Sequence, residues 1–459
     1  MVVKESGFPR LLSPWRIRHS QIRNRVVFPP TCPTWVDDPW SGRFTDQAVA
    51  YYRERAAGGV GLIIIGATHV HPSSLAAPLT VGSLYDNRAI PPLARVAEAV
   101  HAEGAKLAIQ LLHTGVRSML AFKQDTRFDP DAEWFSRAPS QIPLGETPGA
   151  MTPKAMDDGE IEEIIDAFGA AAARAVAAGL DGVEFHLSHG YLPWQFLSPL
   201  YNHRDDAWGG DFERRLQFPV RCLDAMRSAV GDQPFLGYRI NSTSFWPGDL
   251  ETPDVVEVVR ELEKRCDVDY VSVSAGVHHA FIHTPMHFEQ GWERDLASPI
   301  KAVSGKPVLM VGRITEPRVA EQLLVEGHGD AVCLGRQLFC RPGLGHQGRT
   351  RPAKGYPPLR RGQPVLEDCD AGPSRAVCLQ PGDGPRSSMG SRHAPSRRRA
   401  APRARHRGGS RRPRVRAGSS GTRAHRHRRG GRRPGRRSRA TAVAAAHPRR
   451  VRTHRYLAG

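Results

Sequence analysis

Eight short apolar segments alternate with helical patterns between residues 24 and 336, and this alternation limits the folds open to the chain. Near-continuous apolar strands separated by helices indicate a parallel sheet covered on both faces. Eight strand–helix units favour an α/β fold closed into a (β/α)8 TIM barrel, which takes about 250 residues plus insertions. A doubly wound open sheet is the alternative, and it is disfavoured because no glycine-rich phosphate fingerprint follows the first segment. The segments are NRVVFPP (24–30), VGLIIIGA (60–67), KLAIQLLH (106–113), DGVEFHLS (181–188), FLGYRIN (235–241), DYVSVSAG (269–276), KPVLMVG (306–312) and DAVCLGR (330–336).

The distribution of charge divides the chain in two. Residues 346–459 hold 31 of the 65 lysines and arginines but only 4 of the 46 acidic residues, a net charge of +27. Residues 1–345 carry a net charge of −8, which is ordinary for a mildly acidic enzyme-sized domain. We therefore expect a barrel domain over 9–345 and a separate basic tail over 346–459.

The basic tail lacks the residues needed to build a core. From Gly384 onward it contains 25 arginines, no lysine and no acidic residue, and this composition predicts a disordered Arg-rich tail. Non-specific binding to nucleic acid is one interpretation, because phosphate contacts from arginine need no fold. Arginine, glycine, proline and alanine are also the residues of GC-rich codons. A GC-rich gene translated out of frame would therefore give a tail of this composition. We favour this second interpretation, a frameshift, and expect no specific nucleic-acid partner.

Features of the whole sequence predict a cytoplasmic location. The sequence contains no run of eighteen apolar residues, and its start, MVVKESGFPRLLSPW, lacks the apolar core of a signal peptide. Five of the seven cysteines are widely spaced in the body, as is typical of reduced thiols. We expect a protein outside the membrane that acts on a small-molecule substrate, with a homo-oligomer as a possibility.

Polar residues cluster just after the fourth apolar segment. His186, His189 and Tyr191 follow one another at the end of this segment, where side chains of a barrel point into its mouth. Two histidines spaced in this way can converge as a pair of hydrogen-bond donors on a carbonyl or an anion, and an adjacent tyrosine can deliver a proton. The alternative is that one of the histidines is structural.

The stretch that contains these residues resembles the signature of the Old Yellow Enzyme family of FMN-dependent oxidoreductases. It reads HLSHGYLPWQFLSPLYNHRDDAWGGDFERR over 186–215 and matches the pattern HGYL…FLSP…N.R.D..GG..E.R. More narrowly, it is similar to the branch that contains 2,4-dienoyl-CoA reductase, 2-enoate reductases and trimethylamine dehydrogenase. The resemblance covers about residues 9–345, and it implies FMN as cofactor and NAD(P)H as reductant.

The resemblance also implies which residues hold the flavin ring. After the first strand, the family places backbone atoms and a threonine or cysteine against the pyrimidine edge of the flavin. Pro30 and Cys32 match these positions. Ala67 would leave room for the ring, and Gln110 matches the glutamine that hydrogen-bonds the pyrimidine. Arg239 matches the arginine near flavin N1, where positive charge stabilises the reduced anionic flavin. A polar barrel layer or an ion pair is the alternative for Gln110 and Arg239 taken singly.

Glycine–arginine pairs follow the last two apolar segments. They are Gly312–Arg313 and Gly335–Arg336. Backbone amides and an arginine at the last two strand ends form the usual phosphate site of this barrel. We expect these four residues to hold the FMN phosphate.

A histidine-rich stretch follows the sixth segment. His278 matches a histidine that dienoyl-CoA reductases place over the flavin beside the tyrosine, although the match can slip by one to His279. His283 and His287 are near in sequence, but no cysteine or carboxylate joins them at a recognised spacing for zinc. We therefore predict no metal site.

These expectations combine into two possible reactions. In an ene reduction, His186 and His189 would hold the oxygen of an activated alkene, and Tyr191, with His278, would protonate its α-carbon. In the alternative reaction, an N-methyl amine would be oxidised, and Trp35, Trp194 and Trp292 could surround its cation. Substrate and nicotinamide preference stay open.

The C-terminal part of the chain departs from the family branch. Relatives continue into a cysteine-rich 4Fe–4S segment and then into FAD- and NAD(P)H-binding modules, whereas residues after Leu344 show no cysteine cluster. Shifting the reading frame by one base over Leu359–Leu366 permits the sequence Cys-Val-Gly-Ala-Asn-Gln-Cys-Trp, which resembles the segment of relatives that binds the 4Fe–4S cluster. We therefore expect 4Fe–4S and FAD only in an in-frame, full-length relative.

Overall fold

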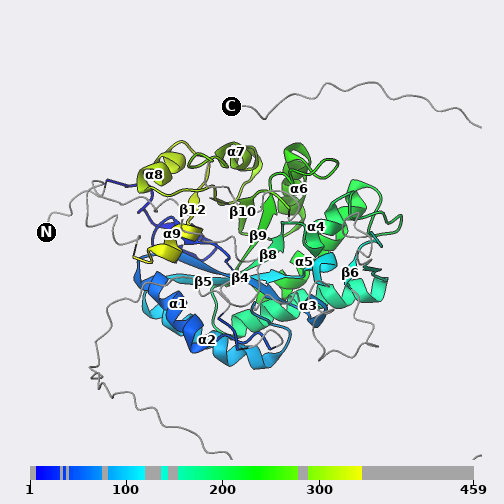
Figure 1. The fold of residues 1–459 in the computed structure, drawn as a ribbon, viewed down its shortest axis with the longest axis horizontal. Helices are drawn as coiled ribbons and strands as arrows, with labels where there is room; N and C mark the ends of the chain where they lie inside the picture. The colour runs from blue at the N-terminus through cyan, green and yellow to red at the C-terminus, as the bar shows by residue number, and fades with distance from the viewer. Residues whose placement is uncertain are drawn as a thin grey trace, which may run out of the picture. The chain divides into compact units, whose positions relative to one another are not determined.

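The structure is a computed structural model, and it describes residues 7–31, 35–37, 41–74, 81–118, 136–142, 153–277 and 288–343. Eight parallel strands close into a barrel in which neighbours follow chain order (Figure 1). Each strand lies within one of the eight apolar segments or extends it by two residues, so the predicted (β/α)8 barrel is confirmed. The strands are β3 (Val26–Phe28), β4 (Leu62–His69), β5 (Lys106–Leu112), β8 (Gly182–Leu187), β9 (Phe235–Asn241), β10 (Tyr270–Ser274), β11 (Val308–Met310) and β12 (Ala331–Cys333).

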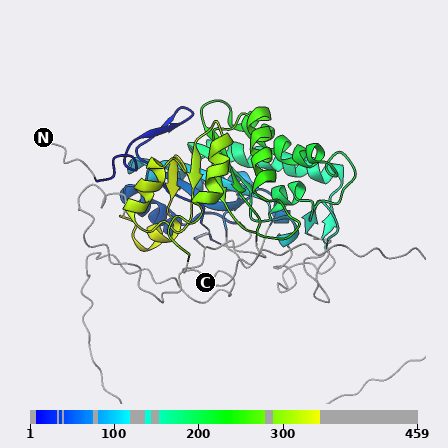
Figure 2. The same cartoon turned by 90° about the horizontal axis from the view of Figure 1, so that it is seen from above.

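Helices lie around the barrel and connect its strands (Figures 1 and 2). A helix follows each of the eight barrel strands, as the alternation of apolar segments and helical patterns predicts. A short β-hairpin precedes the barrel, and two-residue strands pair in the loop after β5. The helices are α1 (Asp46–Ala57), α2 (Ile90–Ala102), α3 (Asp158–Ala177), α4 (Leu192–Leu197), α5 (Phe212–Val230), α6 (Thr252–Arg265), α7 (Arg294–Val303), α8 (Pro317–Val325) and α9 (Gly335–Cys340); the minor strands are β1 (Trp15–Ile17), β2 (Ser20–Ile22), β6 (Arg137–Ala138) and β7 (Lys154–Ala155).

Local sequence explains where α3 begins and how closely it packs. Asp157 caps the helix by accepting from the backbone N–H of Glu160, whose side chain accepts in turn from the N–H of Asp157. This reciprocal capping satisfies two amide donors that would otherwise lack partners. Further along, a Cβ atom at Gly169 would lie 3.2 Å from the Ala225 carbonyl oxygen of α5. The glycine therefore permits the close approach of α3 to α5.

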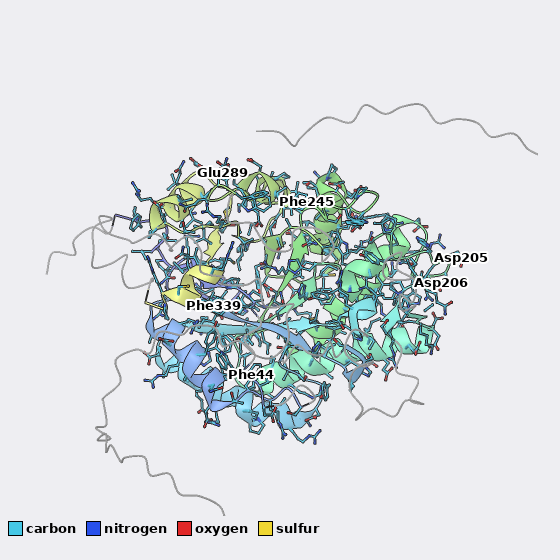
Figure 3. All side chains as sticks on the ribbon, viewed as in Figure 1. Phe44, Asp205, Asp206, Phe245, Glu289 and Phe339 are labelled. Carbon is cyan, nitrogen blue, oxygen red and sulfur yellow. The ribbon has the colours of Figure 1, made fainter. Side chains whose placement is uncertain are left out.

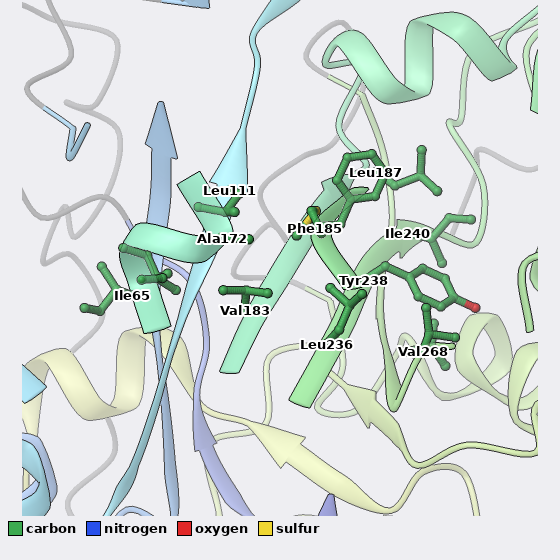
Figure 4. Close-up of a cluster of buried hydrophobic side chains, with 14 of the residues drawn as sticks. Ile65, Leu111, Ala172, Val183, Phe185, Leu187, Leu236, Tyr238, Ile240 and Val268 are labelled. Atoms are coloured by element: carbon green, nitrogen blue, oxygen red, sulfur yellow. The ribbon is translucent and has the colours of Figure 1, made fainter. Parts of the chain in front are cut away.

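Apolar side chains form two cores, one inside the barrel and one between strands and helices. Inside, Val27, Leu62 and Phe235 pack with the hairpin residues Trp15 and Ile17. Leu62 and Phe235 are the first residues of β4 and β9, so this packing lies at the amino-terminal end of the barrel. The outer core surrounds the strands, and Figure 4 shows part of it. The residues labelled there are Ile65, Leu111, Ala172, Val183, Phe185, Leu187, Leu236, Tyr238, Ile240 and Val268.

No helix within the described ranges is long and apolar enough to cross a membrane. The expected disordered tail over 346–459, and the frameshift inferred for it, lie outside the described residues.

Candidate functional site

The candidate residues gather at the carboxyl end of the barrel. All eight strands run parallel, so their carboxyl ends meet at one end, which is where barrels of this type carry their function. In the strand register, Gln110 of β5 pairs with Glu184 of β8, and His186 pairs with Arg239 of β9. Three adjacent strands therefore present polar side chains to the same end.

The turn after β8 brings His186, His189 and Tyr191 together. The ring centroid of His186 lies 5.2 Å from that of His189 and 4.9 Å from that of Tyr191, and both pairs meet edge to face. His189 has a φ of 59°, a left-handed conformation that is uncommon for residues other than glycine. This turn folds the second imidazole back toward the first.

Hydroxyl groups hold both imidazoles in place. Ser188 Oγ lies 3.0 Å from His186 Nδ1, and Ser274 Oγ, at the end of β10, lies 2.9 Å from His189 Nε2. Ser274 also accepts a hydrogen bond from Arg239 Nη2 at 3.1 Å, so its own hydrogen is available to His189 Nε2. In that arrangement the other ring nitrogen of His189 carries a proton. A protonated ring nitrogen can donate to an oxygen on which negative charge develops.

A buried polar layer lies beside these residues inside the barrel. The Glu184 carboxylate accepts a hydrogen bond from Gln110 Nε2 at 2.7 Å and another from the Tyr270 hydroxyl at 3.0 Å. Arg239 donates to Ser272 Oγ at 3.0 Å. Burial raises the pKa of the Glu184 carboxyl, and the charge of Arg239 together with the two donors opposes that rise.

Sequence analysis named Gln110 and Arg239 but missed Glu184 and Tyr270. A signal was present, because side chains two residues apart on a strand share a face and Glu184 precedes His186 by two. For Tyr270 no such signal existed. It stands at the start of its apolar segment, and only the packing shows that its hydroxyl reaches the polar layer.

The turn after β11 contains two residues with left-handed backbone. Gly312 has a φ of 126°, and a Cβ atom there would lie 2.9 Å from Glu293 Cβ and 3.0 Å from its backbone nitrogen. Only glycine therefore fits this position without a backbone shift. Arg313 follows with a φ of 50°, and its Nη1 donates to the Phe288 carbonyl oxygen at 2.7 Å.

The two arginines expected to hold phosphate lie near each other. Burial lowers the pKa of Arg336, and the positive charge of Arg313 lowers it further. A nearby Glu293 carboxyl opposes this effect. Two partly desolvated guanidinium groups that repel one another form a site that a phosphate dianion would stabilise. Gly335 shows no tight contact: the atom nearest to an added Cβ is Pro29 Cγ at 3.6 Å.

The chain after β3 lies directly against β4. A Cβ atom at Gly66 would lie 1.5 Å from the Thr31 carbonyl oxygen, so this crossing requires a glycine. Pro30, which is half-buried, and Ala67, which is 6% exposed, are therefore near neighbours. Two other predicted site residues, Cys32 and His278, lie outside the described residues.

The residues present fit FMN in the chemistry of their donors. Gln110 and Arg239 provide an amide and a cation at the end of the barrel, while Arg313 and Arg336 provide paired cations after the last two strands. Ala67, near the end of β4, has a side chain of a single methyl group and occupies little space there. The first pair suits a polar heterocycle and the second suits a phosphate.

A second histidine cluster, which sequence analysis missed, lies at the ends of β4 and β5. We call His69, His71 and His113 the rim histidines. Ser73 Oγ lies 3.0 Å from His113 Nε2 and 2.8 Å from His71 Nδ1, and Ser74 Oγ lies 2.7 Å from His69 Nδ1. Burial lowers the pKa of His69 to about 3 and that of His113 well below its usual value. Both therefore stay neutral at neutral pH.

No group of three or more histidine, cysteine, aspartate or glutamate side chains in the described part of the chain is arranged to hold a metal ion. His71 and His113 are instead linked through the Ser73 hydroxyl, and His69 contacts the Ser74 hydroxyl. His283 and His287 lie outside the described residues.

Known proteins match this chain over the barrel. The family model described as NADH:flavin oxidoreductase / NADH oxidase family matches residues 10–349. An NADH oxidase of Thermoanaerobacter brockii is 37% identical over 343 residues, which are 73% of this chain and 50% of that protein. An NADPH dehydrogenase of Clostridium acetobutylicum is 32% identical over 337 residues, 72% of this chain and 92% of that protein. The chain thus spans about half the length of the first relative and nearly all of the second.

A solved structure supports the same assignment. A 2-naphthoyl-CoA reductase in complex with 2-naphthoyl-CoA superposes with a TM-score of 0.69 at 27% identity, over 74% of this chain and 52% of that one. The match of the family model covers more than half of the chain and includes every strand of the barrel. The resemblance to Old Yellow Enzymes is therefore confirmed at the level of the family. The chain belongs to the NADH:flavin oxidoreductase / NADH oxidase family.

Proposed function

We propose that the barrel is an FMN-dependent NAD(P)H oxidoreductase that reduces the double bond of an activated alkene. The observation that carries the proposal is the convergence of His186, His189 and Tyr191 beside Arg239 at one end of the barrel. FMN, when bound, supplies the hydride chemistry that links a nicotinamide to the alkene. The relative that is covered to 92% is named an NADPH dehydrogenase, which supports the view that a barrel alone can act.

The side chains divide the work on the substrate between them. His186 and His189 donate hydrogen bonds to a carbonyl or carboxylate oxygen conjugated with the double bond. This withdraws electron density from the β-carbon and stabilises the negative charge that develops on the oxygen. Tyr191 lies beside His186 and delivers a proton to the α-carbon.

The positions of three tryptophans bear on the alternative, oxidation of an N-methyl amine. Trp194 is fully buried, and its indole N–H donates to Asp249. Trp35 packs on Tyr51, which contacts Phe339, whereas Trp292 stacks on Phe245. Figure 3 labels the two phenylalanines well apart, on different sides of the barrel. The three tryptophans therefore do not form one cage, and this favours the ene reduction.

An absorption spectrum of the purified protein tests the proposal. We expect a flavin spectrum that bleaches with NADH or NADPH without oxygen and recovers when an enoate or enone is added. Bleaching by an N-methyl amine, without reoxidation by any activated alkene, would instead support the amine reaction. Absence of flavin after incubation with FMN would reject both.

Replacing Tyr191 with phenylalanine tests its role as the proton donor. We expect kcat for alkene reduction to fall by about 10²-fold, because a positioned acid contributes at least that much. The rate of flavin reduction by NAD(P)H should not change, and stopped-flow absorbance separates the two steps. Tyr85→Phe, in the turn before α2, is the matched control and should leave both rates unchanged. An equal loss in both half-reactions of Tyr191→Phe would contradict the proton-donor role.

Replacing Arg336 with alanine tests the phosphate site. We expect FMN to bind about 10- to 100-fold more weakly, because a hydrogen bond to a charged group contributes about 1.5–3 kcal/mol. Arg336→Lys keeps the charge and should retain part of the affinity. Flavin fluorescence quenching measures the dissociation constant. Arg318→Ala, at the exposed start of α8, is the control. Unchanged affinity in Arg336→Ala would place the phosphate elsewhere.

A further inference from the structure

We propose that Glu184 is a positioning residue for the flavin: it determines which way the Gln110 amide faces and, together with Arg239, sets the reduction potential of the bound cofactor. The inference rests on the proposed function only in requiring that flavin binds. Neither the substrate nor the direction of the reaction enters the argument.

Glu184 is fully enclosed and both of its oxygens are engaged. The side chain is 0% exposed, its Oε1 accepts from Gln110 Nε2 at 2.7 Å, and its Oε2 accepts from the Tyr270 hydroxyl at 3.0 Å. A buried carboxylate without such partners would be strongly destabilising. Both of these contacts donate to the carboxylate and neither accepts from it, which suits the ionised form of Glu184.

The barrel makes room for this contact at one particular residue. Gly237 of β9 pairs with Glu184 on one side and with Tyr270 on the other. A Cβ atom at Gly237 would lie 2.1 Å from Tyr270 Cε1, so any other residue would push the tyrosine ring away. The missing side chain lets Tyr270 reach across a whole strand to the carboxylate. The fold thus builds the Glu184 contact rather than merely tolerating it.

The carboxylate determines the orientation of the Gln110 amide. An ionised carboxylate can only accept hydrogen bonds, so the amide must turn its NH₂ group toward Glu184. The amide oxygen is then the atom left for a ligand. The pyrimidine part of a flavin has one ring N–H between two carbonyl groups, and an amide oxygen is the acceptor that this N–H requires.

The charges of Glu184 and Arg239 act on a bound flavin in opposite directions. Arg239 favours negative charge on a nearby flavin, whereas the Glu184 carboxylate disfavours it. Arg239 lies close enough to Glu184 to favour its ionised form against the effect of burial. Both groups are at least 90% buried, so solvent screens them little. The potential therefore depends on the pair, and Arg239 alone does not set it.

Glu184→Gln in the flavin-loaded protein tests the charge. Glutamine keeps the shape and can still accept from Gln110, so the main change is the loss of one negative charge. We expect the midpoint potential to rise by at least about 30 mV, a tenfold change in the two-electron equilibrium. Glu184→Asp retains the charge and should stay close to the unchanged protein. Glu257→Gln on the exposed face of α6 is the matched control and should have no effect.

Each result has a defined meaning. An unchanged potential in folded, flavin-loaded Glu184→Gln would overturn the proposal, and equal shifts in the Gln and Asp variants would show that packing rather than charge is responsible. Should Glu184→Gln not fold, Tyr270→Phe removes one donor to the carboxylate, favours its protonated form and should raise the potential in the same direction. An unchanged potential there would also overturn the proposal.

Failure to bind flavin would reject the proposed function and leave a separate test of Glu184. In the protein without cofactor, the side-chain amide ¹H–¹⁵N resonances of Gln110 should shift in Glu184→Gln, because the carboxylate partner has become a neutral amide. Resonances that do not move would overturn the contact on which the inference depends. Gln110→Leu identifies the resonances.

Discussion

Replacing His189 with alanine should lower kcat/KM for an α,β-unsaturated carbonyl substrate by about 10²-fold or more, since removal of one donor to a developing oxyanion typically costs 10²–10³-fold. Replacing His186 as well should bring the loss to about 10³-fold. The two losses should not multiply, because the rings are in contact and act on the same oxygen. Anaerobic reduction by NAD(P)H should proceed as before, and rapid-mixing absorbance of each half-reaction measures this.

The left-handed backbone at His189 supplies an informative second variant. Asparagine tolerates a positive φ better than most residues and carries an amide N–H donor, so His189→Asn should retain more activity than His189→Ala. His203→Ala, in the exposed loop before α5, is the matched control. If alkene reduction proceeds at the normal rate in the His186→Ala/His189→Ala variant, the substrate binds elsewhere.

Acid should destabilise the fold through the rim histidines. An unfolded histidine takes up a proton below about pH 6.5. Folded His69 does not do so until about pH 3, because burial lowers its pKa and its Nε2 has no hydrogen-bond partner among the described residues. Between these values the unfolded state binds more protons, so stability falls as the pH falls. The expected loss from His69 is about 1.4 kcal/mol for each pH unit below 6.5.

Denaturant unfolding at several pH values between 7 and 4 measures this loss. His69→Gln cannot be protonated, and its amide oxygen can still accept from Ser74, so its stability should depend less on pH by that amount. His113, fully buried in the same cluster, contributes in the same direction. The exposed His203→Gln should keep the full dependence. Equal pH dependence in His69→Gln and the unchanged protein would show that His69 takes up its proton at the same pH in the folded and unfolded states.

Much of the fold was predictable because its signals are local. Each strand is a short apolar run, and α3 has both its own helical period and its own cap at Asp157. The motif around His186 was recognisable for a related reason. His186, His189 and Tyr191 lie within six residues of one another, so residues that are close in the chain are also close in the fold. The two glycine–arginine pairs after β11 and β12 belong to the same class.

Of the contacts not predicted from the sequence, those of Glu184 and His113 join separate strands or the loops that follow them. Tyr270 reaches Glu184 only because β9 stands between them with a glycine at position 237. His69 and His113 come together only because β4 and β5 are neighbours, and after a shift in the register His69 pairs with Leu112, the residue before His113. The three tryptophans show the opposite case. The sequence allowed them to surround a cation together, but the packing does not bring them into one cage.

The sequence by itself determined that this chain forms a parallel (β/α)8 barrel of the NADH:flavin oxidoreductase family with a histidine pair at the end of its fourth strand. Hydrophobic periodicity, apolar runs and sequence motifs are properties of consecutive residues, so they can be recognised without a structure. The tertiary structure alone decided which of these side chains meet inside the barrel. Barrel closure and strand register enclose the Glu184 carboxylate with Gln110, Tyr270 and Arg239, and they bury His69 and His113, which stay neutral at neutral pH.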